Sequence, residues 1–421
     1  MAKRSWKGAP AVLARGDEVA VNPSFARACP HIECMKKVGI FTTHPIQYQA
    51  PVWRQLAASG RFSVKVFFFS DHGVTSRMDS GFGETFAWDL PLLEGYEHEF
   101  LSRVPISQVA AATIPRLPRL LERERFDVVM VHGYAAAYTR QLLRRQRPGG
   151  YRYVMRGEFS TLNDPSSATW RAIVKRPYLA RLYRHVDLFS SIGSDSTAHL
   201  LQHGVPGDKI VVAPYCVDDA LIEAQRDSCD RAEARRRLGI EDGTTLILFS
   251  GKLIARKQPL LLADAISRLP NVQRVAACFL GAGEQRDAIE ATLRPILGPR
   301  LLMPGFVNQS QLGGFFAAAD VFSLPTAYDT WGLVVNEAMH WGLACVVSDR
   351  AGCHKDLIID GQTGVLHKWN EPVGLAACLG RLIREPGMMA AMGTRARRHA
   401  DGYRSAVTTE RLLESFERVS A

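Results

Sequence analysis

Two acidic residues eight positions apart stand where a polar loop passes into a predicted helix. Asp329 comes just before the helix expected over Gly332–Trp341, and Glu337 lies about two turns inside it. Because this helix follows a short apolar run, its free N–H groups and the positive end of its dipole face the space above the predicted sheet, which makes a phosphate site. Helical rise places Glu337 roughly 11 Å further along the axis. With a diphosphate at the helix start, Glu337 can accept hydrogen bonds from a ribose diol, and Asp329 can touch the group beyond the diphosphate.

Two cations five residues apart form a second candidate for phosphate binding. Lys252 and Lys257 follow the apolar run Thr245–Ser250, and Arg256 can share their task. A pair of cations is a weak signal alone. Facing the helix start near Asp329, however, it would offer positive charge to the same departing diphosphate, and such electrostatic help is often the largest catalytic contribution.

The elements that must position these residues are short apolar runs that alternate with helical patterns. This alternation predicts an α/β fold with doubly wound parallel sheets covered by helices. Six or seven such units precede residue 215 and a second series follows it, as expected for two domains in a chain of 421 residues. The runs expected to form strands lie at 38–42, 64–69, 127–131, 151–155, 187–192, 209–213, 245–250, 275–280, 301–304, 320–324 and 344–348.

The helix near Glu337 has recognisable ends. Thr330 or Asp329 is expected to cap its start, and Gly342 to end it in the left-handed conformation. The alternative to a phosphate site is an ordinary β-α-β unit with a capping Asp and a solvated Glu.

The string DTWGLVVNEAM, followed by a glycine, resembles the E-x(7)-E element of retaining, nucleotide-sugar-dependent glycosyltransferases of family 4. Enzymes of that family have the GT-B fold, in which two Rossmann-like domains face each other across a cleft that holds the active site. Asp329 stands where the family has its first Glu, and Lys252 stands where the family has Arg, so a bidentate fork is replaced by a point charge. The resemblance covers about residues 35–420 and is strongest over 245–366.

Residues 1–34 carry no periodic apolar pattern, so they are expected to be a disordered extension or the product of an upstream translation start. For the rest of the chain, the resemblance implies an acceptor-side Rossmann-like domain over residues 35–216 and a nucleotide-sugar-binding Rossmann-like domain over residues 217–402. Residues 403–421 are expected to be a C-terminal helix, of the kind that in GT-B enzymes crosses back to the first domain.

The resemblance also implies the site residues. Lys252 and Lys257 would stabilise the departing diphosphate, and His132 and Asp329 would contact sugar hydroxyls. The string HPIQYQAPVWR and the segment RGE resemble family segments that lie at the cleft. The donor-binding set is Gly251, Lys252, Lys257, Gly281, Phe306, Val307, Asp329, Thr330, Trp331, Gly332, Leu333 and Glu337, and the acceptor-side set is His44, Gln47, Tyr48, Gln49, Arg156 and Glu158. For the first loop and for His132, a purely structural role stays open.

The net charge of +10 and the pI of about 9.3 indicate an anionic partner: nucleotide phosphates, anionic lipid head groups or nucleic acid. A zinc-finger, RNP or helix-turn-helix signature is missing, which argues against nucleic acid. The basic, aromatic-rich segment Trp170–His185 can lie on an anionic membrane surface or pack in a core with a solvated basic face. The eight cysteines form no C-x-x-C pair, which favours free thiols in a reducing compartment.

We therefore predict a hexosyltransferase-type enzyme that moves a sugar from a UDP- or GDP-linked donor to a hydroxyl of a sugar or lipid-linked acceptor. Family resemblance implies retention at the anomeric carbon and a setting in polysaccharide, lipopolysaccharide or glycolipid synthesis. No cofactor or metal is expected, because no Asp-x-Asp or His-x-His cluster appears where phosphate would sit. The expected location is cytoplasmic, peripheral at the inner membrane face.

Three rival functions stay open: a GT-B sugar-nucleotide epimerase, a phosphorylase, and a non-catalytic nucleotide-sugar-binding protein, the last because Asp329 replaces Glu. A dinucleotide oxidoreductase is disfavoured, since no G-x-G-x-x-G follows the first strand.

Overall fold

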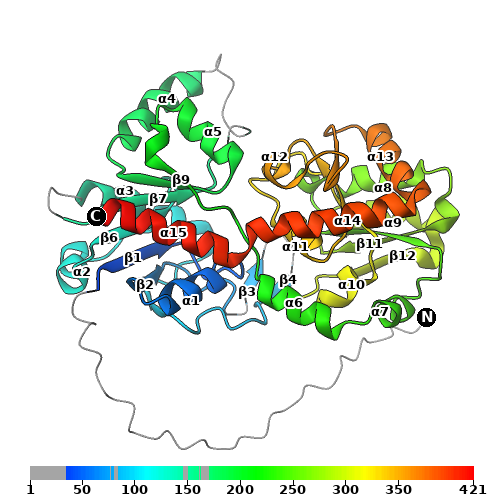
Figure 1. Ribbon diagram of the computed structural model, residues 1–421, viewed down its shortest axis with the longest axis horizontal. Helices are drawn as coiled ribbons and strands as arrows, with labels where there is room; N and C mark the ends of the chain where they lie inside the picture. Colours follow the sequence, from blue (N-terminus) through cyan, green and yellow to red (C-terminus); the bar gives the residue numbers. More distant parts are fainter. Residues whose placement is uncertain (1–34, 76, 80–83, 146–149, 161, 163–169) are drawn as a thin grey trace, which may run out of the picture. The chain divides into compact units, whose positions relative to one another are not determined.

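The computed structural model describes residues 35–421 except 76, 80–83, 146–149, 161 and 163–169. Residues 36–421 form one compact unit that holds two parallel sheets, each covered by helices, as the alternating pattern predicts (Figure 1). The expected disordered extension, residues 1–34, lies outside the described residues.

The first sheet has seven parallel strands in the order β5-β2-β1-β6-β7-β8-β9. The order reverses between β1 and β6, so the loops that follow these two strands lie side by side at the carboxyl ends of the central strands. The strands are β1 (Lys37–Thr42), β2 (Ser63–Phe68), β5 (Glu97–Phe100), β6 (Val128–His132), β7 (Arg152–Gly157), β8 (Leu188–Ser191) and β9 (Ile210–Val212). The helices of this half are α1 (Ala50–Ala58), α2 (Leu117–Glu124), α3 (Ala137–Arg145), α4 (Trp170–Tyr183) and α5 (Ser194–Gln202).

The second sheet has six parallel strands in the order β12-β11-β10-β13-β14-β15, which is the doubly wound order 3-2-1-4-5-6. Its strands are β10 (Thr245–Ser250), β11 (Val275–Leu280), β12 (Leu301–Gly305), β13 (Val321–Leu324), β14 (Ala344–Ser348) and β15 (Gly364–His367). The accompanying helices are α6 (Asp219–Ser228), α7 (Arg231–Arg237), α8 (Pro259–Ser267), α9 (Arg286–Leu297), α10 (Gly313–Ala318), α11 (Leu333–His340), α12 (His354–Leu357), α13 (Pro372–Arg384) and α14 (Pro386–Ala400). The chain then returns to the first half as α15 (Ser405–Ser420).

Residues 72–90, which their composition suggests to be a long loop, contain a short antiparallel hairpin instead. Strands β3 (Arg77–Asp79) and β4 (Glu84–Phe86) pair over three residues each. Strands this short leave too little alternation to be seen among glycines and polar residues. The hairpin belongs to the first half, and the chain that leaves it reaches the second sheet's loops, as described below.

The last helix, α15, lies beside α1 of the first half (Figure 1, red and blue). Gln55 of α1 donates a hydrogen bond to the Ser405 hydroxyl (2.8 Å) and accepts one from Thr409 (2.9 Å). The rings of Phe416 and Phe62 meet edge to face at 5.7 Å. The apolar face of α15 thus packs on the strands of the first sheet, beside α1.

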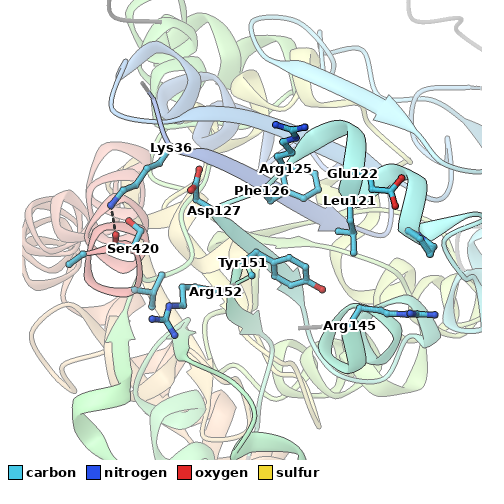
Figure 2. A pocket seen from close by; sticks show the side chains of 14 residues that line it. Lys36, Leu121, Glu122, Arg125, Phe126, Asp127, Arg145, Tyr151, Arg152 and Ser420 are labelled. Atoms are coloured by element: carbon cyan, nitrogen blue, oxygen red, sulfur yellow. Dashed lines mark hydrogen bonds between the residues drawn. The ribbon is translucent and has the colours of Figure 1, made fainter. Parts of the chain in front are cut away.

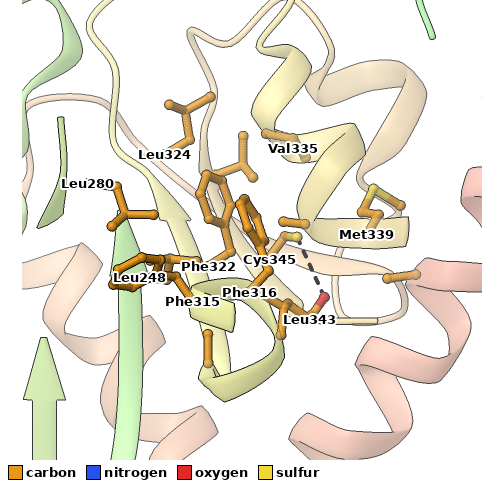
Figure 3. Close-up of a cluster of buried hydrophobic side chains, with 14 of the residues drawn as sticks. Leu248, Leu280, Phe315, Phe316, Phe322, Leu324, Val335, Met339, Leu343 and Cys345 are labelled. Carbon is orange, nitrogen blue, oxygen red and sulfur yellow. Dashed lines mark hydrogen bonds between the residues drawn. The ribbon is translucent and has the colours of Figure 1, made fainter. Parts of the chain in front are cut away.

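Helix α11 is held against the second sheet by an apolar cluster (Figure 3). Val335 and Met339 point from α11 into the cluster, opposite Leu248 and Leu280 of the sheet, and all four are buried. Burying this face on every turn fixes both the position and the rotation of the helix. The orientation of its opposite face, which carries Glu337, is therefore fixed as well.

Helix α5 of the first half takes its N-terminal cap from the second half. Ser194, its first residue, donates to the Asp356 carboxylate from its backbone N–H (3.0 Å to both oxygens) and from its hydroxyl (2.8 Å). Asp356→Ala removes a cap and should lower the free energy of unfolding by about 0.5–2 kcal/mol. Urea denaturation measures the loss, with the exposed Asp242→Ala as control. Equal stability of the two variants would show that this cap contributes nothing.

Candidate functional site

The predicted phosphate-binding loops meet at the reversal point of the second sheet. Strand β10 pairs with β13, so the loop after β10, with Lys252 and Lys257, lies next to the loop after β13, with Asp329. Ligands of open parallel sheets bind at this point, beyond the carboxyl ends of the strands. Arg256 ties the two loops together: its guanidinium donates to the Tyr328 carbonyl (3.0 Å).

A cavity of about 390 Å³ opens over this point. All twelve residues predicted to bind the donor lie around it, including Gly251, Gly281, Phe306 and Val307 from the neighbouring strand ends. The first half contributes part of the wall. The remaining lining residues are Gln47, Trp88, Glu158, Tyr215, Ser250, Arg256, Leu280, Gln309, Leu312 and Val334.

One cation of the cavity is already paired. The Lys257 ammonium contacts the Asp329 carboxylate, and both side chains are mostly buried. The carboxylate holds the ammonium at the cavity wall, where its remaining donors can meet an anion. Asp329, whose side chain is shorter than that of the Glu in the resembling element, therefore anchors the Lys257 ammonium.

The start of α11 differs from the expectation in one respect. Neither Thr330 nor Asp329 caps it: the residue before the helix is Gly332, in the left-handed region at φ 100°, and no side chain satisfies the first N–H groups. The predicted cap is wrong because the helix begins only at Leu333, so that Gly332 occupies the N-cap position after both candidates. The N–H groups of Leu333 and Val334, which have no acceptor within the helix, are thus left at the cavity for a ligand. The C-terminal prediction is confirmed, since Gly342 follows the helix at φ 77°.

Glu337 faces the cavity from the second turn of α11. The side-chain amide of Gln309 lies 3.5 Å from its carboxylate. The protein surrounding Glu337 removes water from it, and this desolvation raises the pKa of the carboxyl from 4.5 to about 7. A carboxylate in such a place gains from donors that a ligand brings, such as a pair of hydroxyl groups.

His132 lies in a second cavity of about 340 Å³, at the reversal point of the first sheet. Its Nε2 lies 3.3 Å from the side-chain nitrogen of Gln49 in the loop after β1, and its ring meets Trp53 edge to face at 5.9 Å. Burial, aided by the nearby Arg156 charge, lowers the pKa of His132 to about 3. The imidazole is therefore neutral, and its Nδ1 is a buried atom without a hydrogen-bond partner in the described part of the chain.

The predicted acceptor-side residues are divided between the cavities. Gln47 lines the first cavity, Tyr48 and Gln49 the second, and Glu158 both. His44 and Arg156 line neither of these two cavities. His44 packs against His72, and Arg156 is buried, donating to the Ser190 hydroxyl (3.2 Å) and the Ala213 carbonyl (2.7 Å).

Tyr215 joins the two cavities. Its hydroxyl donates to Glu158 (3.1 Å), its ring lies 5.2 Å from that of Tyr48, and the Arg156 guanidinium lies over the same ring. The sequence indicates this tyrosine only as part of the connection between the halves. Trp88 gives no signal at all, because it belongs to no strand–loop–helix pattern. The carboxylate of Glu158 is thus the charged group shared by both cavities.

A larger cavity of about 590 Å³ lies elsewhere (Figure 2). It opens near the start of β1, β6 and β7, and its lining includes Asp127, Arg152 and the last residues of α15; the Lys36 ammonium donates to the Ser420 carbonyl there. This cavity thus lies at the amino ends of the strands, whereas open parallel sheets bind ligands at the carboxyl ends. The cavity between the loops after β10 and β13 is therefore the better candidate for chemistry, despite its smaller size.

Two family models match the chain. Residues 230–399 match the family described as glycosyl transferases group 1, and residues 45–216 match the glycosyl transferase 4-like domain. A D-inositol 3-phosphate glycosyltransferase of Xylanimonas cellulosilytica is 30% identical over 202 residues, which cover 46% of this chain and 48% of that protein. The chain thus spans about half the length of the curated relatives it matches.

Solved structures match over nearly the whole chain. A glycosyltransferase from Rickettsia africae has a TM-score of 0.71 at 14% identity, covering 91% of this chain and 98% of its own. HepE of Anabaena, in complex with UDP and glucose, has a TM-score of 0.66 at 17% identity, covering 91% of this chain and 100% of its own. At such identities these similarities show the fold alone, which consists of two Rossmann-like halves.

Proposed function

This chain belongs to the glycosyl transferases of group 1 and has the GT-B fold, and from that premise we propose that it transfers a hexose from a nucleoside diphosphate sugar to a hydroxyl group. The observation that carries the proposal is the meeting of Lys257 and the uncapped start of α11 at one cavity. Two sources of positive potential there would hold a diphosphate and stabilise it as the glycosidic bond breaks. The complex of HepE with UDP and glucose supports this class of donor.

The other residues follow from that placement. A ribose beyond the diphosphate would give its hydroxyl groups to Glu337, and the base would meet the turn at Phe306 and Val307. The sugar would lie toward Glu158, where the two cavities share a wall, so that the acceptor hydroxyl approaches from the side of His132. We further propose retention at the anomeric carbon and a reaction without metal, in which Lys252 and Lys257 neutralise the leaving group.

Release of nucleoside diphosphate tests this proposal. Purified protein is incubated with UDP- and GDP-linked glucose, galactose and mannose, with and without a mixture of saccharide acceptors, and the free diphosphate is measured. We expect release from one nucleotide class and a faster rate with acceptor. An epimerase would convert the donor sugar without consuming an acceptor, and a non-catalytic protein would bind the donor without releasing the diphosphate.

Donor binding should depend on pH through Glu337. Only the ionised carboxyl can accept hydrogen bonds from both ribose hydroxyls, and its pKa is raised to about 7. Binding should therefore strengthen as pH rises, with the dissociation constant of the nucleotide sugar falling about tenfold between pH 6 and pH 8. Calorimetric titration at both values measures this. Glu337→Gln, which does not titrate, should show a flat profile, and an equally steep profile in that variant would assign the effect to another group.

We also propose peripheral association with an anionic membrane surface. Residues 36–212 carry 23 Lys and Arg against 15 Asp and Glu, whereas residues 213–421 carry 24 of each. On α4 and just after it, Arg176, Arg181 and Arg184 are exposed. Basic faces of this kind gain about 1 kcal/mol per cation near anionic lipid. Among the described residues, no helix is long and apolar enough to cross a membrane.

A further inference from the structure

A short segment of the first half, Ala87–Asp89, reaches the second half beside the donor cavity. It follows the β3–β4 hairpin, and Trp88 is the member of this segment that lines the cavity. Its ring centroid lies 6.3 Å from that of Phe306, at an interplanar angle of 55°. The aromatic wall at the β12 turn is thus built from both halves.

Hydrogen bonds fix the segment at this place. Asn308 donates its side-chain amide to the Ala87 carbonyl (2.8 Å) and accepts from the Asp89 N–H (3.4 Å). The Asp89 carboxylate in turn accepts from the Ser310 hydroxyl and from the Ser310 N–H (3.3 Å). Hydrogen bonds on both sides of Trp88 therefore tie the segment Ala87–Asp89, here called the arm, to the turn that begins at Phe306.

The first half also supports Trp88 from behind. The Trp88 N–H donates to the Gly73 carbonyl (2.9 Å), and a Cβ built on Gly73 would lie 2.7 Å from the indole Cδ1. Gly73 has φ 86°, so both its conformation and its close approach to the indole require glycine. The ring is thus clamped between its own half and Phe306, which orients it before any ligand binds.

We propose that Trp88 is a donor-binding residue that covers the nucleoside end of the cavity, with Asp89 as the positioning residue that holds the arm in place. This rests on the proposed function. The diphosphate end is supplied by Lys252, Lys257 and α11 of the second half, so the nucleobase lies toward Phe306, under the indole. An aromatic face contributes stacking and removes water from the base. The first half therefore recognises part of the donor as well as the acceptor.

The test compares a nucleotide with its phosphate portion alone. Calorimetry measures binding of UDP, GDP and inorganic pyrophosphate to wild type, Trp88→Ala and Trp88→Phe, with Trp369→Ala as a matched control, because Trp369 is 40% exposed and lies outside the cavity. We expect Trp88→Ala to weaken binding of the preferred nucleotide about tenfold or more and Trp88→Phe to restore part of it. Pyrophosphate binding should change less than twofold in both, and Trp369→Ala should bind like wild type.

Each other outcome has a definite meaning. If Trp88→Ala and Trp88→Phe both bind the nucleotide as wild type does, Trp88 does not touch the nucleoside. An equal loss of nucleotide and pyrophosphate binding in a folded variant would also overturn the proposal, because it would reveal a general disturbance of the cavity. If wild type binds neither UDP nor GDP, the proposed function itself fails. Thermal unfolding of each variant verifies folding. Asp89→Asn leaves the indole intact and should weaken binding of the nucleotide only about two- to fivefold, because charged hydrogen bonds are lost.

Discussion

Lys257→Ala is expected to lower kcat for diphosphate release by about 10²- to 10³-fold, the size found when a preorganised donor to a developing charge is removed. Lys257 is mostly buried and lies at the cavity beside the start of α11, so no bulk water can take over its role fully. The substitution also leaves Asp329 without its cation, and this buried negative charge would then repel the departing diphosphate. Steady-state measurement of nucleoside diphosphate release gives the value.

Two further variants separate charge from other effects. Lys257→Arg keeps the charge and should recover a large part of the rate, while Lys355→Ala, an exposed lysine of α12, should leave the rate unchanged. A kcat for Lys257→Ala within threefold of wild type would mean that the leaving group is stabilised elsewhere.

Glu337→Ala should weaken donor binding by about 2–4 kcal/mol, that is, about 30- to 1,000-fold, since two charged hydrogen bonds to a ribose diol are lost. The change is expected in the dissociation constant of the nucleotide sugar, measured by calorimetry at pH 8, where the wild-type carboxyl is ionised. Truncating a side chain that lies at the cavity wall removes no cluster contact, so the fold should persist.

The control for this variant is Glu241→Ala, an exposed glutamate of the same half. It should bind the donor as wild type does. If the donor binds Glu337→Ala with unchanged affinity, the ribose does not contact Glu337. That result would leave the diphosphate site at Lys257 untouched.

The sequence predicts the second half well because its signals are local. Buried parallel strands produce continuous apolar runs, and three of them, at 245–250, 275–280 and 344–348, match β10, β11 and β14 to the residue. The order of these strands then brings the loops after β10 and β13 together, since the reversal point of a doubly wound sheet lies between them.

What the sequence does not reveal depends on contacts between distant segments. The ion pair of Lys257 with Asp329 joins residues 72 positions apart, so no local pattern could have revealed it. Trp88 reaches Phe306 from another half of the chain, so no periodic pattern could have placed it in the cavity. Arg156, which the resemblance of the RGE segment places on the acceptor side, is instead buried and donates to Ser190 and Ala213.

The most direct measurement is a crystal structure with the bound nucleoside diphosphate. We expect the diphosphate between Lys257 and the N–H groups of Leu333 and Val334, with the ribose hydroxyls on Glu337. A nucleotide bound in the cavity of Figure 2, or one whose phosphates point away from α11, would contradict it.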